Sequence, residues 1–146
     1  MRVVLAYSGS LEASAAIGWL RRRREAEVVA VTLDLGQGRE LEAVRDRALA
    51  VGAQRAHVLD AREAFADGCV LPALRAGARH ASGAPMGQAL SRPIIAAKLV
   101  DIAAIERADA VAHAGGSGTS RLHRLLADLD PGVPVLDPVR EWNLTE

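Results

Sequence analysis

The residues most able to do chemistry lie between an apolar run and the first predicted helix. Val3 to Tyr7 has the length and β-branching of a buried parallel strand, and a helix is predicted from Ala13 to Arg24. Small residues join them, including Ser8, Gly9 and Ser10. A strand, a small-residue loop and a helix N-terminus form an anion site, because unpaired N–H groups point outward there. Since no Gly-Lys-Ser/Thr follows, the loop is either a phosphate site of another kind or an ordinary β-loop-α connection.

Composition limits the classes of protein to consider. A length of 146 residues fits one domain over residues 1–146, and 18 basic residues balance 18 acidic ones. Neither nucleic acid nor an anionic membrane surface is therefore an expected partner. No apolar run approaches the ~18 residues of a membrane span, and the single cysteine, Cys69, excludes an intramolecular disulfide. We expect a cytoplasmic protein.

Predicted strands and helices alternate along the chain. Strands are expected at residues 3–7, 27–34, 55–60, 109–114 and 133–136, and helices at 13–24, 40–51, 62–79, 93–106 and 121–129. Pro72 should kink or divide the third helix, and Pro93 should begin the fourth. This alternation predicts a parallel sheet covered on both faces. Ligands of such sheets bind at the carboxyl ends of the strands, where the loops 8–14, 34–38 and 114–120 are expected to meet.

Five segments, in order along the chain, resemble argininosuccinate synthase: VVLAYSGSLEAS, EVVAVTLDLGQG, PMGQALSRPIIAAKLVDIA, DAVAHAGGSG and PVREWNLT. The likeness covers the whole chain but only that family's N-terminal nucleotide-binding domain. It implies a Rossmann-like HUP fold of the α/β class, with a doubly wound five-stranded parallel sheet of order 3-2-1-4-5. The family adenylates the ureido oxygen of citrulline with ATP, releases pyrophosphate, and lets aspartate displace AMP.

The resemblance implies ATP and Mg²⁺ as cofactors. The first loop is similar to the Ser-Gly-Gly-x-Asp-Ser/Thr-Ser loop of ATP pyrophosphatases, with Ser10 and Glu12 replacing its second Gly and its Asp. Leu33 occupies the family's adenine-contacting position, and Ala114 replaces a glycine after the fourth strand. The full set of implied nucleotide contacts is Ala6, Tyr7, Ser8, Gly9, Ser10, Glu12, Ser14, Leu33, Ala114 and Gly115.

The positions implied to face the substrate, Gln88, Ser120, Arg121 and Arg124, depart further from the family. Only Arg124 keeps the family's residue, in a position expected to pair with a substrate carboxylate. Gly118 stands where the family has Lys, and Arg121 stands where it has Asp. An arginine there reverses the site's preference for the amino group of aspartate. Any second ligand is therefore expected to be an anionic small molecule, unless both arginines simply face solvent.

Each of the remaining polar candidates could have a functional or a purely structural role. His113 ends the fourth predicted strand, where it could contact phosphate or serve as a hydrogen-bonded structural histidine. His80 and His123 border the implied substrate pocket, and His57 is predicted to pack within its strand. Asp34 and Asp137 end strands, where they could hold Mg²⁺ with ATP or cap loops. No resident metal site is predicted.

Three functions stay open. The first is an ATP-binding protein that adenylates a carbonyl or ureido oxygen and releases pyrophosphate, alone or with a partner subunit. The second is a non-catalytic module that binds ATP or AMP. The third is the N-terminal half of a split argininosuccinate synthase, because the family's second domain would begin where this sequence ends. A second copy or a partner subunit is an expected partner, and the sequence assigns no catalytic residue.

Overall fold

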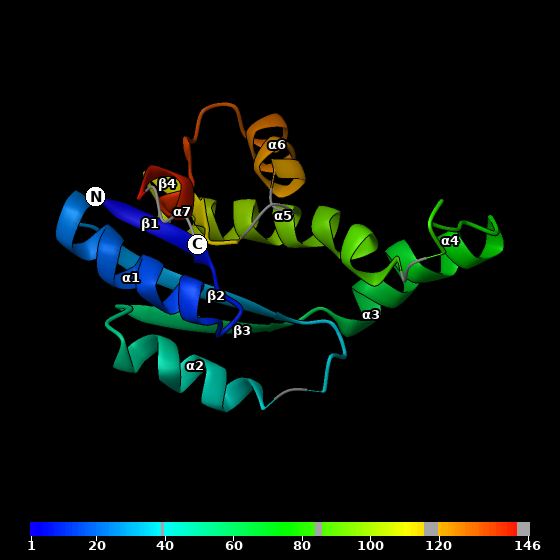
Figure 1. The fold of residues 1–146 in the computed structure, drawn as a ribbon, viewed down its shortest axis with the longest axis horizontal. Helices are drawn as coiled ribbons and strands as arrows, with labels where there is room; N and C mark the ends of the chain where they lie inside the picture. The colour runs from blue at the N-terminus through cyan, green and yellow to red at the C-terminus, as the bar shows by residue number, and fades with distance from the viewer. Residues whose placement is uncertain (39, 84–85, 116–119, 143–146) are drawn as a thin grey trace.

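A five-stranded parallel sheet in the order β3-β2-β1-β4-β5 organises the computed structural model (Figure 1). The structure describes residues 1–38, 40–83, 86–115 and 120–142. The strands are β1 (Arg2–Ala6), β2 (Glu27–Asp34), β3 (Arg55–Asp60), β4 (Ala110–His113) and β5 (Val135–Leu136). The predicted order and the doubly wound α/β class are confirmed, and the strand ends differ from the predicted ones by two residues at most.

Helices cover both faces of the sheet. On one face lie α1 (Leu11–Arg24) and α2 (Leu41–Ala50), with the short α7 (Pro138–Glu141) beside α1; on the other lie α5 (Gly87–Glu106) and α6 (Ser120–Leu129) (Figure 1). Successive side chains of β1 enter opposite layers: Val3 packs with Ile17 of α1, and Val4 packs with Leu99 of α5. All four of these side chains are fully buried. This two-sided burial explains why the central strands are continuous apolar runs.

A helical arm projects from the body and carries α3 (Arg62–Phe65), a π-helical turn η1 (Ala66–Val70) and α4 (Leu71–Arg75) (Figure 1). A single helix was predicted here up to Arg79, divided or kinked at Pro72. The division is confirmed and takes the form of the π turn, which precedes Pro72 in the first turn of α4. Proline lacks an N–H and crowds the carbonyl four residues earlier, so the wider π spacing accommodates it. No residue in these three elements is buried.

The prediction that Pro93 begins a helix is wrong. Helix α5 begins at Gly87 and contains Pro93 in its interior. Proline removes one N–H donor, whereas Gln88, Ala89 and Leu90 before it are good helix formers. The backbone N–H of Leu90 donates to the Met86 carbonyl at 2.9 Å, so the helix is already established ahead of the proline. No helix of the described residues is long and apolar enough to cross a membrane.

Candidate functional site

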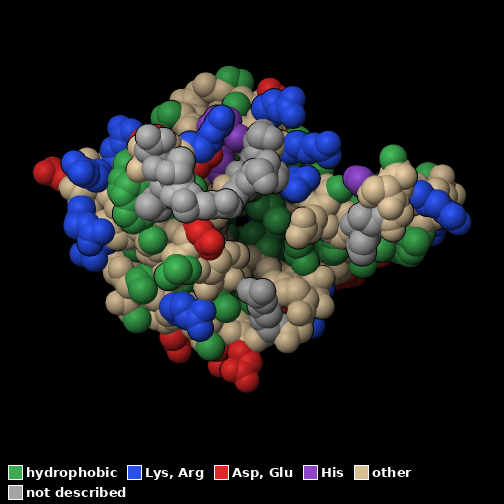
Figure 2. All heavy atoms as spheres, in the orientation of Figure 1, with side chains coloured by type: hydrophobic (Ala, Val, Ile, Leu, Met, Phe, Trp, Pro, Cys, Tyr) green, Lys and Arg blue, Asp and Glu red, His purple; other side chains and the backbone are tan. Residues whose placement is uncertain are grey.

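A cavity of about 420 Å³ opens at the carboxyl edge of the sheet. Its floor comes from the ends of β1, β2 and β4, and its walls come from α2, α5 and α6. Figure 2 shows a hollow with hydrophobic side chains in its depth near the middle of the drawn face. The apolar lining is Ala6, Val31, Leu33, Leu35, Leu41, Val44, Ile95, Ala114 and Leu122, and the polar lining is Tyr7, Ser8, Thr32, Gln37 and His113.

The structure brings half of the residues predicted to contact nucleotide into this lining: Ala6, Tyr7, Ser8, Leu33 and Ala114. The others belong to the loop and first turn of α1 or follow β4: Gly9, Ser10, Glu12, Ser14 and Gly115. The predicted convergence of two strand-following loops therefore occurs around one cavity. Of the third such loop, residues 116–119 lie outside the described part of the chain.

Helix α2 fixes the conformation of the first loop. Gly9 has a φ of 77°, and a Cβ there would lie 3.2 Å from Cγ1 of Val44. A side chain at Gly9 would thus be strained twice, by backbone conformation and by the close approach of α2. Nη1 of Arg47 donates to the Gly9 carbonyl at 2.9 Å and ties the loop to the same helix. Helix α2 therefore holds the backbone of the first loop in place at Gly9.

Serine hydroxyls in this loop satisfy the start of α1. Oγ of Ser10 caps the helix by accepting from Ala13 N at 3.2 Å. Oγ of Ser14 donates to the Ser10 carbonyl at 2.8 Å and lies 2.9 Å from the Tyr7 hydroxyl. Because the only proton of Ser14 is used on that carbonyl, Tyr7 donates to Ser14. These bonds hold Tyr7, which is 4% exposed, between β1 and α1.

Glu12 places a carboxylate in the first turn of α1. Its own backbone N–H and the Ser10 hydroxyl lower the pKa of Glu12 below the usual value, so it is anionic at neutral pH. The positive end of the helix dipole favours that charge. This carboxylate therefore already uses part of the anion-binding capacity of the helix N-terminus.

Two histidines meet at the cavity. His113, at the end of β4, is 1% exposed, and its Nε2 lies 3.1 Å from Nδ1 of His123 on α6, with the two rings at 88°. Burial lowers the pKa of His113; the charge of Asp137 raises it, and His123 and Arg140 lower it further. Within the described residues, Nδ1 of His113 is buried without a hydrogen-bond partner. A buried polar atom without a partner costs about 1–3 kcal/mol.

The other predicted polar candidates have local roles or lie elsewhere. Asp34 accepts from the Gly36 N–H at 2.9 Å, and Asp137 accepts from the Arg140 N–H at 3.3 Å, so both cap turns. His80 bonds Ser82 at 2.7 Å and lines a different cavity beside α4, so the structure does not unite it with His123. No group of three or more His, Cys, Asp or Glu suited to a metal occurs among the described residues.

The residues predicted to face the substrate lie outside the cavity lining. Gln88, Arg121 and Arg124 are exposed on α5 and α6, while Leu122 between the arginines points into the cavity wall. The side chain of Ser120, like Gly118, lies outside the described residues. Figure 2 shows Lys and Arg side chains gathered over α5 and α6 beside the hollow. The arginines thus lie on a cationic rim rather than inside the cavity.

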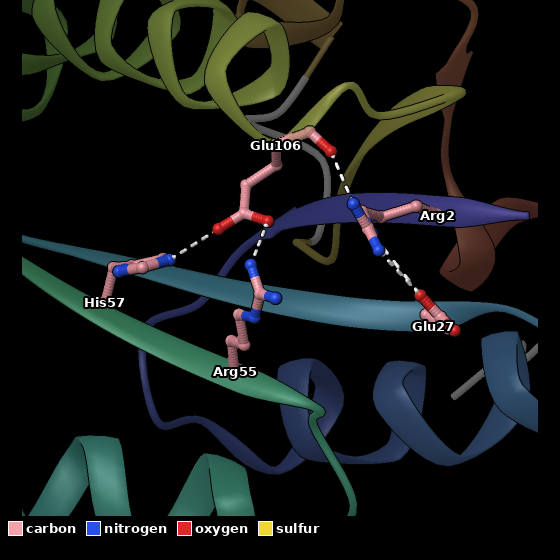
Figure 3. Close-up of polar contacts among 5 residues, drawn as sticks. All are labelled: Arg2, Glu27, Arg55, His57 and Glu106. Atoms are coloured by element: carbon pink, nitrogen blue, oxygen red, sulfur yellow. Dashed lines mark hydrogen bonds and ion pairs between the residues drawn. The ribbon is translucent and has the colours of Figure 1, made fainter.

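Glu106 forms a second polar cluster, apart from the cavity (Figure 3). The Glu106 side chain is only 6% exposed and lies 2.7 Å from Nη1 of Arg55 and 3.0 Å from Nε2 of His57. Arg2 donates to the Glu106 carbonyl at 2.7 Å and pairs with Glu27 at 3.1 Å. The prediction that His57 merely packs in its strand is wrong. His57 lies on the edge strand β3, and its ring bonds the buried carboxylate of Glu106 at the end of α5.

Sequence reasoning missed Gln37, Val44, Arg47 and the partner role of His123. Gln37 stands between two glycines after a strand, a pattern that could have drawn attention to it. Arg47 carried no such signal, because it is one of two arginines on its helix and only tertiary packing reveals its bond to Gly9.

A comparison with protein families matches residues 2–146 to the family described as "Arginosuccinate synthase N-terminal HUP domain". Argininosuccinate synthase of Streptococcus thermophilus is 46% identical over 144 residues, which are 97% of this chain and 36% of that protein. The enzyme of Streptococcus suis is 44% identical over the same shares. The chain thus spans little more than a third of the length of these relatives.

Two solved structures are similar in fold alone. A predicted subunit of tRNA methyltransferase from Methanocaldococcus jannaschii has a TM-score of 0.59 at 11% identity, covering 94% of this chain and 67% of that one. A universal stress protein in complex with cAMP has a TM-score of 0.52 at 18% identity, covering 94% of both chains.

Proposed function

The chain belongs to the arginosuccinate synthase N-terminal HUP domain family, and we propose that residues 1–146 form one nucleotide-binding domain that binds ATP at the carboxyl edge of its sheet. The observation that carries this proposal is the cavity bounded by the ends of β1, β2 and β4 and closed by the loop that Arg47 and Val44 hold in place. Crevices of this kind at strand ends are the usual ligand sites of open α/β sheets.

The lining suits the two ends of a nucleotide. Leu33, Leu35 and Ile95 offer an apolar wall for a base. Ser8 and the loop before α1 offer backbone donors and the positive end of a helix dipole for phosphates. His113 adds a polar side chain to the lining at the end of β4.

The reaction we propose is adenylation of a carbonyl or ureido oxygen. That oxygen attacks the α-phosphorus of ATP, the bond between this phosphorus and the oxygen bridging to the β-phosphorus breaks, and pyrophosphate leaves with the electron pair. The chain's own contribution is positioning and stabilisation of negative charge by preorganised N–H groups. Mg²⁺ bound to the phosphates would neutralise the same charge, and neither Asp34 nor Asp137 is free of a capping role. We assign no catalytic residue.

A second candidate function is binding of ATP or AMP without a reaction. The positions of the residues expected to face a substrate support it. Gln88, Arg121 and Arg124 are exposed and line no part of the cavity, so the described residues expected to face a substrate do not adjoin the proposed nucleotide site. A second copy or a partner subunit could supply it, as could the remaining length that the relatives have. The arginines exposed on α6, Arg121 and Arg124, favour an acceptor that bears carboxylates or phosphates and no amino group near them.

Two assays separate these functions. Calorimetry with ATP, ADP and AMP measures binding, and a screen for pyrophosphate release over carboxylate- and ureido-bearing acceptors measures chemistry. We expect ATP binding and no pyrophosphate release with citrulline plus aspartate. Pyrophosphate release with citrulline plus aspartate, if it disappeared in Arg124→Ala, would show that the synthase reaction survives. That result would contradict the anionic-acceptor proposal.

A further inference from the structure

Strand β2 extends past the end of β1 at the cavity. The last paired residues are Ala6 and Val31, and Tyr7 N donates to the Val31 carbonyl at 2.8 Å. Carbonyls two residues apart in a strand point to the same side, so the Leu33 carbonyl faces the side that β1 has left. Leu33 and Leu35 both line the cavity there. The backbone of β2 thus offers hydrogen-bonding groups to the cavity that no strand uses.

The side-chain amide of Gln37 takes both of those groups. Its Nε2 donates to the Leu33 carbonyl at 2.8 Å, and its Oε1 accepts from the Leu35 N–H at 2.7 Å. A carbonyl can only accept and an N–H can only donate, so the orientation of this amide is fixed by its partners. The Leu33 carbonyl and the Leu35 N–H therefore form a pair that binds a neighbouring donor and acceptor, the donor at the carbonyl and the acceptor at the N–H.

The turn that returns Gln37 to the strand end is local and open. Gly36 and Gly38 on either side have φ values of 88° and 67°, with no atom within 4 Å of a Cβ built on either. Asp34 closes the turn by accepting from Gly36 N at 2.9 Å. Gln37 itself is exposed, so its side chain can leave the strand end without unpacking the apolar wall.

The pattern of the amide matches one class of base. Adenine carries an amino donor at N6 beside an unprotonated acceptor at N1, in the same order and at nearly the same spacing as the two atoms of a primary amide. Hypoxanthine and guanine present the reverse, an acceptor oxygen at C6 and an N–H at N1. Either would place an oxygen against the Leu33 carbonyl and an N–H against the Leu35 N–H.

We propose that Gln37 is an internal competitor for base recognition, occupying the Leu33 carbonyl and Leu35 N–H until the 6-amino edge of an adenine nucleotide displaces it. The proposal rests on the proposed function, because it requires nucleotide in this cavity. Gln37 then sets the affinity for adenine nucleotides, while the backbone pair beneath it discriminates against 6-oxopurines.

Calorimetry with AMP and IMP tests the proposal on the full chain, with Gln37→Ala and Gln37→Asn as variants. Asparagine keeps the amide but is one methylene shorter, so it cannot bridge both groups. Gln54→Ala, at an exposed glutamine on the opposite edge of the sheet, is the matched control. We expect both Gln37 variants to bind AMP about tenfold more tightly than the unmodified chain (about 1.4 kcal/mol). The control should match the unmodified chain, and IMP should bind more weakly than AMP throughout.

A spectroscopic readout guards against a disordered loop in the variants. The side-chain amide signals of Gln37 in the ¹⁵N-labelled chain, identified by their loss in Gln37→Ala, should shift on saturation with AMP. Equal or weaker AMP binding by both variants, or amide signals that do not move at saturation, would overturn the role of Gln37 and leave the proposed function intact. Absence of AMP and ATP binding by every form of the chain would overturn both.

Discussion

Nε2 of His113 lies 3.1 Å from Nδ1 of His123, so one proton serves both nitrogens. If His113 donates, its buried Nδ1 is an acceptor; if His123 donates, that Nδ1 carries the proton and is a donor. The tautomer of the half-buried His123 therefore decides whether the buried Nδ1 of His113 is a donor or an acceptor.

The pair gives the fold a pH dependence with a definite sign. Because the pKa of His113 is lowered by burial, the unfolded chain takes up a proton more readily than the folded one. Stability is then full above the unfolded value of 6.5 and falls as the pH drops below it. The midpoint temperature of thermal unfolding should fall as the pH is lowered from about 8 to about 5.5. In His113→Gln the midpoint should fall less over the same range.

The exposed His80 supplies the matched control for this titration. The variant His80→Ala should keep the slope of the unmodified chain, because this ring lies at the surface and bonds the neighbouring Ser82. A slope that is the same in His113→Gln as in the unmodified chain would assign the pH dependence to other groups.

Glu106 should contribute stability in a more acidic window. Burial raises the pKa of Glu106, but the hydrogen bonds and charges of His57 and Arg55 outweigh it, so the pKa lies below the usual 4.5. Its contribution is therefore present above pH 4.5 and is lost as the pH falls below that value. Glu106→Gln keeps the shape but removes the charge, and we expect a loss of about 1–2 kcal/mol in urea unfolding at neutral pH. Glu63→Gln, at an exposed glutamate, should cost nothing measurable, and an equal loss in both variants would contradict the role of the cluster.

Arg47 should matter for nucleotide affinity without touching the nucleotide. Its bond to the Gly9 carbonyl, at 2.9 Å, holds the first loop against α2. Arg47→Ala should weaken ATP binding several-fold in calorimetry, because the loop would then lose conformational entropy when ATP binds. Arg45→Ala is the matched control, at an exposed arginine two residues away whose Nε lies 3.8 Å from the Asp46 carboxylate, and it should bind ATP as the unmodified chain does. Similar affinities in the two variants would show that the loop orders itself without Arg47.

Elements whose rules are local were predictable from the sequence. The apolar runs of β1 and β2 and the glycine-bearing loops after them follow from periodicity and turn chemistry, and the strand order followed from family resemblance. The helix start predicted at Pro93 was wrong, because proline is tolerated in the first turn of a helix but the helix formers ahead of Pro93 start α5 earlier. His57 and Glu106 are 49 residues apart, and their pairing depends on how α5 crosses the sheet. Gln37 could be placed in a loop, but only the path of β2 beyond β1 shows what its amide covers.

Titration of ATP with Mg²⁺ into the unmodified chain, Gly9→Val and Gly83→Val by calorimetry tests the central claim most directly. Both glycines have positive φ, 77° and 74°, but only Gly9 meets another residue, Val44 at 3.2 Å. The account predicts that the unmodified chain and Gly83→Val bind ATP alike, whereas Gly9→Val binds at least tenfold more weakly, about 1.4 kcal/mol. Unchanged affinity in a folded Gly9→Val, or no binding of ATP by the unmodified chain, would contradict it.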